Sequence, residues 1–77
     1  MSQFTHATFL SILQEQFPDR DWSELSEEAS LEDVGIDSLD KATLVMKVEE
    51  VAGVTISDEL YDELNTPRNI VELVVSQ

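Results

Sequence analysis

The sequence predicts a small all-α protein, and three observations support that class. Apolar residues make up 42% of the chain and recur at helical spacing, so the strong acidity does not indicate disorder. Helix-capping residues stand at the borders of the spaced segments. A chain of 77 residues has room for one modest core. We therefore expect a single domain over residues 1–77, a four-helix bundle of three longer helices and one short helix, with a long loop between the first two.

The first helix is predicted by an apolar stripe that Pro18 ends. Its N-cap is either Thr5 or Ser2. A long polar connection follows over residues 18–36, and it carries apolar residues that predict a loop pinned to the core. The stripe consists of Phe9, Leu10, Leu13 and Phe17, and the loop anchors are Trp22, Leu25, Leu31, Val34 and Ile36.

The second helix is predicted from Ser38 to Ala52, with Asp37 as N-cap and Gly53 as the residue that ends it. It has two apolar faces. The expected core face comprises Leu44, Val45, Val48, Val51 and Ala52. The opposite, narrower strip comprises Leu39, Ala42 and Met46. This strip either packs under another segment or forms an exposed landing strip for a partner protein.

Two further helices complete the bundle. Ser57 is the expected cap of a short helix that carries Leu60 and Leu64. Thr66 and Pro67 form an N-cap followed by a proline in the first helical position. They open a last helix whose apolar residues are Ile70, Leu73 and Val74.

The charge and the missing cysteines exclude several classes of function. Seventeen acidic residues face four basic ones, a net charge of −13, which repels nucleic acids and anionic membranes and attracts basic partners. Without cysteine there is no disulfide, thiolate metal site or cysteine nucleophile. Neither a secretory leader nor a membrane span is evident, so we expect a cytoplasmic protein.

No residue pattern predicts an enzyme or a metal site. The one histidine, His6, fits a structural role near the start of the first helix, and a metal ion needs more clustered ligands. Acidic spacings match no calcium loop. A hydrolytic serine is not expected because the strained glycine–serine elbow is absent. We expect no catalytic residue and no metal ligand.

The most informative segment runs from Leu31 to Asp40. Gly35 permits a tight turn, Asp37 caps the second helix, and Ser38 occupies its first position. Free N–H groups and the positive end of the helix dipole favour a phosphate group at such a serine.

This segment resembles the acyl carrier protein family, through Gly35-Ile-Asp-Ser-Leu-Asp40 and the continuation Leu44-Val-Met-Lys-Val-Glu-Glu50. The resemblance extends over essentially the whole chain. It implies that a phosphopantetheinyl transferase attaches 4′-phosphopantetheine from coenzyme A to Ser38. The thiol of that arm then carries acyl groups as thioesters, which fits a chain without cysteine. The implied protein is a monomer that serves fatty-acid, polyketide or related specialised biosynthesis.

The resemblance also implies a docking surface on the second helix for acyl-transferring, ketosynthase-type or other acyl-processing enzymes with basic patches. The expected docking surface includes Ala42 from the narrow apolar strip. Its members are Asp37, Leu39, Asp40, Ala42, Met46, Glu49 and Glu50. Lys41, Lys47 and Thr43 depart from the more uniformly acidic helix of fatty-acid carriers, which leaves room for a dedicated carrier with its own enzymes. If the bundle shelters cargo, the expected lining is Leu44, Val48, Ile56, Leu64 and Ile70.

Two alternatives stay open. One is a carrier of aminoacyl, D-alanyl or peptidyl groups, although an aspartate before Ser38 and Leu39-Asp40 after it favour the acyl type. The other is an unmodified acidic helical module that binds partner proteins through the same surface. Ser38→Ala separates them, because only a carrier depends on the hydroxyl.

Overall fold

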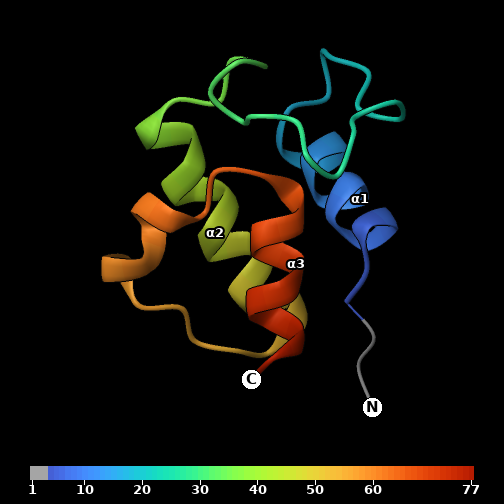
Figure 1. Ribbon diagram of the computed structural model, residues 1–77. Helices are drawn as coiled ribbons and strands as arrows, with labels where there is room; N and C mark the ends of the chain where they lie inside the picture. The colour runs from blue at the N-terminus through green and yellow to red at the C-terminus, as the bar shows by residue number, and fades with distance from the viewer. Residues whose placement is uncertain (1–3) are drawn as a thin grey trace.

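The computed structural model describes residues 4–77, and its regular structure over that range is entirely helical (Figure 1). The elements are α1 (His6–Gln16), α2 (Ser38–Ala52), the 3₁₀-helix η1 (Asp58–Glu63) and α3 (Pro67–Val75). The all-α prediction, the single short helix and the long loop before α2 are therefore confirmed, and α2 has the predicted bounds.

Each helix begins at a side chain that accepts a backbone N–H. Thr5 accepts from Thr8 at the start of α1, and the alternative cap, Ser2, lies outside the described residues. The other N-caps are Asp37, Ser57 and Thr66, as predicted. These caps replace hydrogen bonds that the first turn of a helix cannot make within itself.

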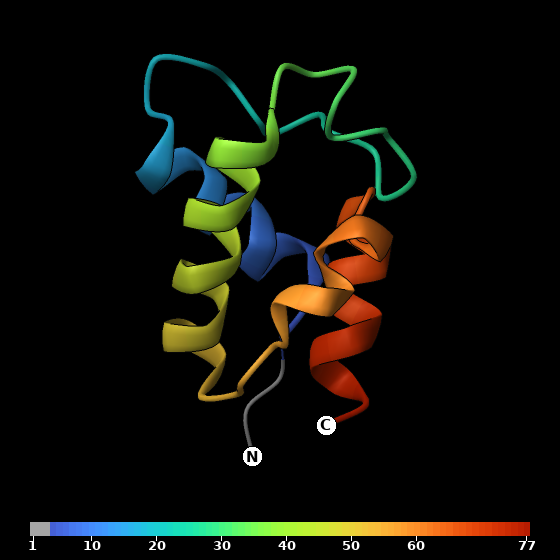
Figure 2. The ribbon, with the colours of Figure 1, turned by 90° about the vertical axis from the view of Figure 1, so that its left-hand side faces the viewer.

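The helices enclose one core, and the long loop closes one end of it. In Figures 1 and 2, α2 and α3 run in the same direction, and the loop crosses the end at which both begin. Hydrogen bonds hold it there, from Leu31 N to the Asn65 carbonyl (2.9 Å) and from Arg68 N to the Glu27 carbonyl (2.9 Å). The predicted pinning of the loop is thus confirmed, and the start of α2 is fixed against the start of α3.

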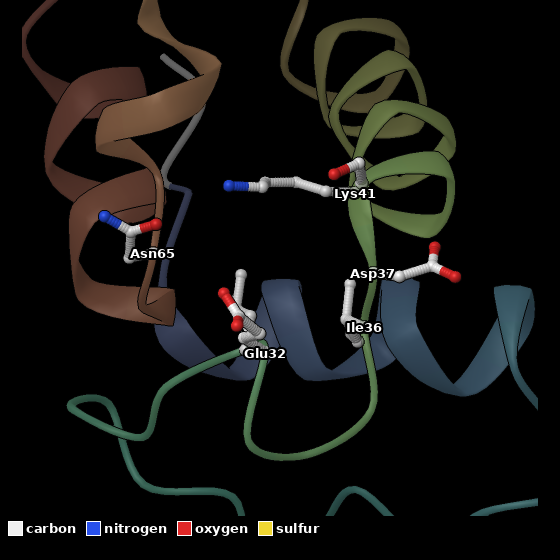
Figure 3. Close-up of a pocket in the computed structure, with 7 residues that line it drawn as sticks. Glu32, Ile36, Asp37, Lys41 and Asn65 are labelled. Atoms are coloured by element: carbon white, nitrogen blue, oxygen red, sulfur yellow. The ribbon is translucent and has the colours of Figure 1, made fainter.

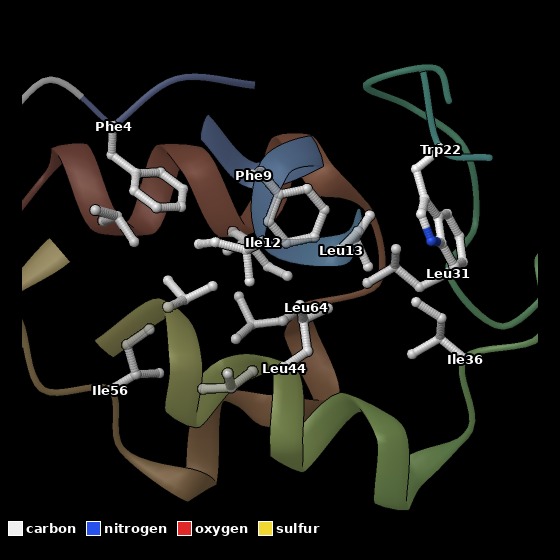
Figure 4. Close-up of a cluster of buried hydrophobic side chains, with 14 residues drawn as sticks. Phe4, Phe9, Ile12, Leu13, Trp22, Leu31, Ile36, Leu44, Ile56 and Leu64 are labelled. Carbon is white, nitrogen blue, oxygen red and sulfur yellow. The ribbon is translucent and has the colours of Figure 1, made fainter. Parts of the chain in front are cut away.

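The core draws on the three α-helices, on the long loop and on residues that flank η1 (Figure 4). Its buried members are Phe4, Phe9, Ile12, Leu13, Trp22, Leu31, Ile36, Leu44, Val45, Val48, Ile56, Leu64, Ile70 and Val74. Ile12 was absent from the predicted stripe of α1. The prediction of Val51 in the core is wrong, since its side chain is 48% exposed. Val51 lies in the last turn of α2, one residue before the helix ends at Ala52.

Candidate functional site

Ser38 occupies the first position of α2 and is exposed. The Asp37 side chain just before it accepts the N–H of Asp40 (2.9 Å), and the Asp37 carbonyl accepts the N–H of Lys41 (2.8 Å). These bonds fix the backbone on both sides of Ser38 while its hydroxyl stays accessible. The positive end of the α2 dipole stabilises an anion bonded at this position.

The turn that leads into Ser38 is braced from the far end of the long loop. Gly35 has a φ of +89°, and a Cβ at this residue would lie 2.9 Å from Nη1 of Arg20. The Arg20 guanidinium donates to the Val34 carbonyl and stacks over the ring of Trp22, with Cζ 5.2 Å from the ring centroid. Glycine is therefore favoured here by backbone conformation and by close approach alike.

A cavity of about 300 Å³ opens beside Ser38. It is lined by Leu31, Glu32, Ile36, Asp37, Ser38, Lys41 and Asn65. Figure 3 shows the Lys41 side chain extending from α2 across this space toward the segment that carries Asn65. Its ammonium donates to the Tyr61 carbonyl (2.9 Å). Ser38 thus shares the cavity with one cation, two carboxylates and an amide.

The expected docking residues lie on or near the surface of α2. Leu39 and Met46 are 72% and 63% exposed, and Ala42 between them is half-buried. The narrower apolar strip is therefore not packed under another segment. Asp37 and Glu50 are exposed and Asp40 is half-buried, so carboxylates accompany this strip.

Glu49 differs from the other docking candidates. Its carboxylate accepts the N–H of Ile56 at 2.8 Å, and its side chain is half-buried. This bond ties the segment after α2 back onto the helix. Like the Asp37 carboxylate, which caps α2, the Glu49 carboxylate is therefore already engaged within the chain, and it is the less exposed of the two.

The two lysines of α2 have different surroundings. Lys47 Nζ lies 4.0 Å from Glu50 Oε1, so its charge is directed toward the carboxylates of the helix surface. Lys41 instead faces the cavity. The sequence indicated a charge on the helix surface for both lysines and no role for Asn65. The sequence signal that could have placed Lys41 beside Ser38 is its i+3 spacing from that serine, which puts both residues on one face of the helix.

The residues expected to line a cargo tunnel are all packed in the core. Leu44, Val48, Ile56, Leu64 and Ile70 are at most 4% exposed. None of them lines the cavity beside Ser38. The role of these five residues in sheltering cargo therefore stays a prediction.

His6 has the structural role that the sequence indicated. Its Nε2 lies 2.8 Å from the Leu25 carbonyl oxygen, and since a carbonyl only accepts, Nε2 carries the proton. The bond ties α1 to the long loop. Within residues 4–77, no group of three or more His, Asp or Glu side chains is placed to hold a metal ion. None of the described helices is both long and apolar enough to cross a membrane.

Comparison with known proteins agrees with this geometry. Residues 7–74 match the family described as "Phosphopantetheine attachment site". An acyl carrier protein of Rubrobacter xylanophilus is 41% identical over 70 residues, which cover 86% of each chain. An acyl carrier protein of Treponema pallidum is 44% identical over 45 residues, 58% of each chain.

The fold has a close structural counterpart as well. The crystal structure of an acyl carrier protein from Thermotoga maritima superposes with a TM-score of 0.82 at 27% identity, covering 91% of this chain and 81% of that one. The family match covers most of the chain, and the sequence relatives and the fold agree with it. The chain belongs to the acyl carrier protein family, whose members are non-catalytic carriers built around 4′-phosphopantetheine.

Proposed function

We propose that Ser38 carries 4′-phosphopantetheine and that the protein holds acyl intermediates on it as thioesters. The observation that supports Ser38 is its exposed hydroxyl at the positive end of α2, inside the Gly35-to-Asp40 motif and beside a cavity. Asp37 holds the helix start in place, and the free N–H groups of the first turn favour the phosphate that modification adds.

The attachment reaction follows from the groups present. The Ser38 oxygen forms a bond to the phosphorus that bears the pantetheine of coenzyme A, and the bond from that phosphorus to the adenosine bisphosphate breaks. The serine proton goes to a base of the transferase. When bound, the arm supplies a thiol, which this chain lacks. Ser38 and its helix then present the arm, while partner enzymes act on the cargo.

The strip formed by Leu39, Ala42 and Met46 is the proposed docking surface. Its exposed apolar side chains give a partner something to bury, and the surrounding carboxylates steer basic patches toward it. Asp37, Asp40 and Glu50 are the carboxylates available for this role. Glu49 takes part more weakly, because its bond to Ile56 N would have to break.

The pathway is one of fatty-acid, polyketide or related specialised biosynthesis. Lys47 and Thr43 support a carrier with its own partner enzymes, since each makes the surface of the helix less acidic. The cognate transferase and the acyl-processing enzymes are the expected partners.

Intact mass tests the attachment site. The protein is incubated with coenzyme A and a broad-specificity phosphopantetheinyl transferase, alongside Ser38→Ala and the matched control Ser57→Ala, whose exposed serine stands at the start of η1 as its N-cap. We expect one phosphopantetheine on the wild type and on Ser57→Ala, and none on Ser38→Ala. If the cognate transferase also left the wild type unmodified, the carrier function would be wrong and the acidic binding module would take its place.

The docking surface has a separate test. Met46→Glu puts a charge in the strip, and Val75→Glu puts the same charge on a residue of equal exposure (64%) at the end of α3. We expect Met46→Glu to slow loading by the transferase about tenfold, equivalent to about 1.4 kcal/mol, while Val75→Glu loads at the wild-type rate. Equal rates for all three proteins would contradict docking through α2.

A further inference from the structure

One hydrogen bond bridges α2 and η1. Within residues 4–77, the Lys41 ammonium donates to the Tyr61 carbonyl (2.9 Å), and no other hydrogen bond or ion pair links these two helices. Figure 3 shows the Lys41 side chain extending away from α2 into the space beside it. None of the six residues of η1 is buried, so packing alone holds this helix weakly. We call the bond from Lys41 to the Tyr61 carbonyl the clasp.

The clasp lies between Ser38 and the hydrophobic core. Ser38, Lys41 and Val45 follow one another at i+3 and i+4 spacing, so they share one face of α2. Lys41 therefore stands one turn after Ser38 and one turn before Val45, which is fully buried. On the other side of the clasp, the Tyr61 carbonyl also accepts the N–H of Leu64 (3.1 Å), whose side chain is buried in the core. A group that moved from Ser38 along this face into the core would have to displace the clasp.

We propose that Lys41 determines the class of cargo: its clasp keeps alkyl chains out of the core and suits this carrier to short or polar acyl groups. The proposal rests on attachment at Ser38. A short or polar acyl group gains little from an apolar interior, so it stays outside, where partner enzymes reach it. A long alkyl chain gains more with each methylene group that it buries. The clasp therefore sets a chain length below which the cargo stays exposed.

The strength of the clasp gives the size of the expected effect. A hydrogen bond made by a charged group contributes about as much to stability as the burial of two or three methylene groups. The clasp is partly buried, and an alkyl chain lying against it would take the ammonium out of water without offering it an acceptor. Loss of the ammonium should therefore let chains about two methylene groups shorter enter the core.

The test follows the core by NMR as the cargo lengthens. A broad-specificity phosphopantetheinyl transferase loads Ser38 directly from acyl-coenzyme A that carries an acetyl, butanoyl, hexanoyl, octanoyl or decanoyl group, and intact mass confirms each product. The methyl resonances of Leu64 and Ile70, which are 2% and 0% exposed, report whether the chain has entered the core. The acetyl form of each protein is the reference, because its cargo has no alkyl chain to bury.

Two matched variants isolate the ammonium of the clasp. Lys41→Met keeps the length of the side chain without the charge, and Lys47→Met makes the same change where the lysine faces Glu50. We expect the core resonances of Lys41→Met to move at a chain about two methylene groups shorter than in the wild type and in Lys47→Met. Equal chain lengths in all three proteins, wild-type resonances that already move with butanoyl, or Lys41→Met resonances that do not move even with decanoyl would overturn the proposal.

A conservative variant separates the hydrogen bond from the rest of the side chain. Lys41→Arg keeps a positive charge and N–H groups that can donate to the Tyr61 carbonyl. We expect its core resonances to move at the wild-type chain length. A length as short as that of Lys41→Met would contradict the clasp. A protein that the cognate transferase does not load at all would instead overturn attachment at Ser38, so the two failures are distinguishable.

Discussion

At its N-terminal end α2 follows Gly35 and Asp37, and at its C-terminal end it stops at Gly53. Both glycines have positive φ, +89° and +70°. The first end leaves Ser38 exposed beside a cavity. At the second end the Glu49 carboxylate accepts the N–H of Ile56, and the Gly53 N–H bonds to the Glu49 carbonyl (2.9 Å). The two ends of α2 thus have similar turns but differ in what is left free. The proposed attachment chemistry belongs to the N-terminal end, which is the open one.

The glycines give the largest expected difference between the ends. Gly35→Ala should lower the free energy of unfolding by about 2 kcal/mol, because positive φ strains alanine and the Arg20 bond to Val34 must shift. Gly53→Ala should lower the free energy of unfolding by only about 1 kcal/mol. Positive φ strains alanine there too, but the added Cβ meets nothing within 4 Å. Urea denaturation measures both. Equal losses would show that Arg20 does not brace the open end.

Glu49 and Glu50, near the C-terminal end of α2, give a second comparison. We call this the closed end, because the Glu49 carboxylate is bonded to the Ile56 N–H there. Glu49→Ala should lower the free energy of unfolding by about 1–2 kcal/mol, because the Ile56 N–H loses its acceptor in a partly buried position. Glu50→Ala, next in sequence and exposed, should change it by less than about 0.5 kcal/mol. Thermal unfolding of both variants checks this. If Glu50→Ala cost as much, the bond to Ile56 would not be what closes this end.

The smallest expected effect is a dependence on alkaline pH. Burial, and then the charges of Glu49 and Asp58, raise the pKa of Tyr61 above its ordinary value of 10.0. The folded state therefore binds this proton more tightly than the unfolded state does. The resulting stability is fully present below pH 10 and is lost as the pH rises through the raised pKa. Stability measured from pH 9 to pH 11 should fall less steeply in Tyr61→Phe, and an identical slope would contradict the raised pKa.

Local sequence signals were sufficient for the elements and for the exposed end of α2. A capping side chain satisfies N–H groups only a few residues away, so Asp37, Ser57 and Thr66 could be identified from the sequence itself. The role of Ser38 stays a prediction, which depends on the resemblance of a short motif around it to the family. Val51 was misassigned because helical periodicity gives the direction of a side chain but not where its neighbours end.

Local sequence signals could not predict contacts between segments that lie far apart in the sequence. The bond from Lys41 to the Tyr61 carbonyl spans 20 residues, and the approach of Arg20 to the Gly35 turn joins the two ends of the long loop. The same limit applies to Glu49, which has the composition of a docking residue and the contacts of a structural one. The i+3 spacing places Lys41 on the same face of the helix as Ser38, but nothing in the local pattern shows that a cavity lies on that face.

The sequence by itself determined the helices, their caps, the acidic charge and the serine that the family motif marks. Each of these depends on neighbours a few positions away or on composition. Only the tertiary structure decided which side chains surround that serine. The long loop is bonded to the start of α3 and leads into α2, and this arrangement brings Lys41, Glu32 and Asn65 to one cavity. The physical reason is that the hydrophobic core fixes how these segments meet, and their polar groups are positioned as a consequence.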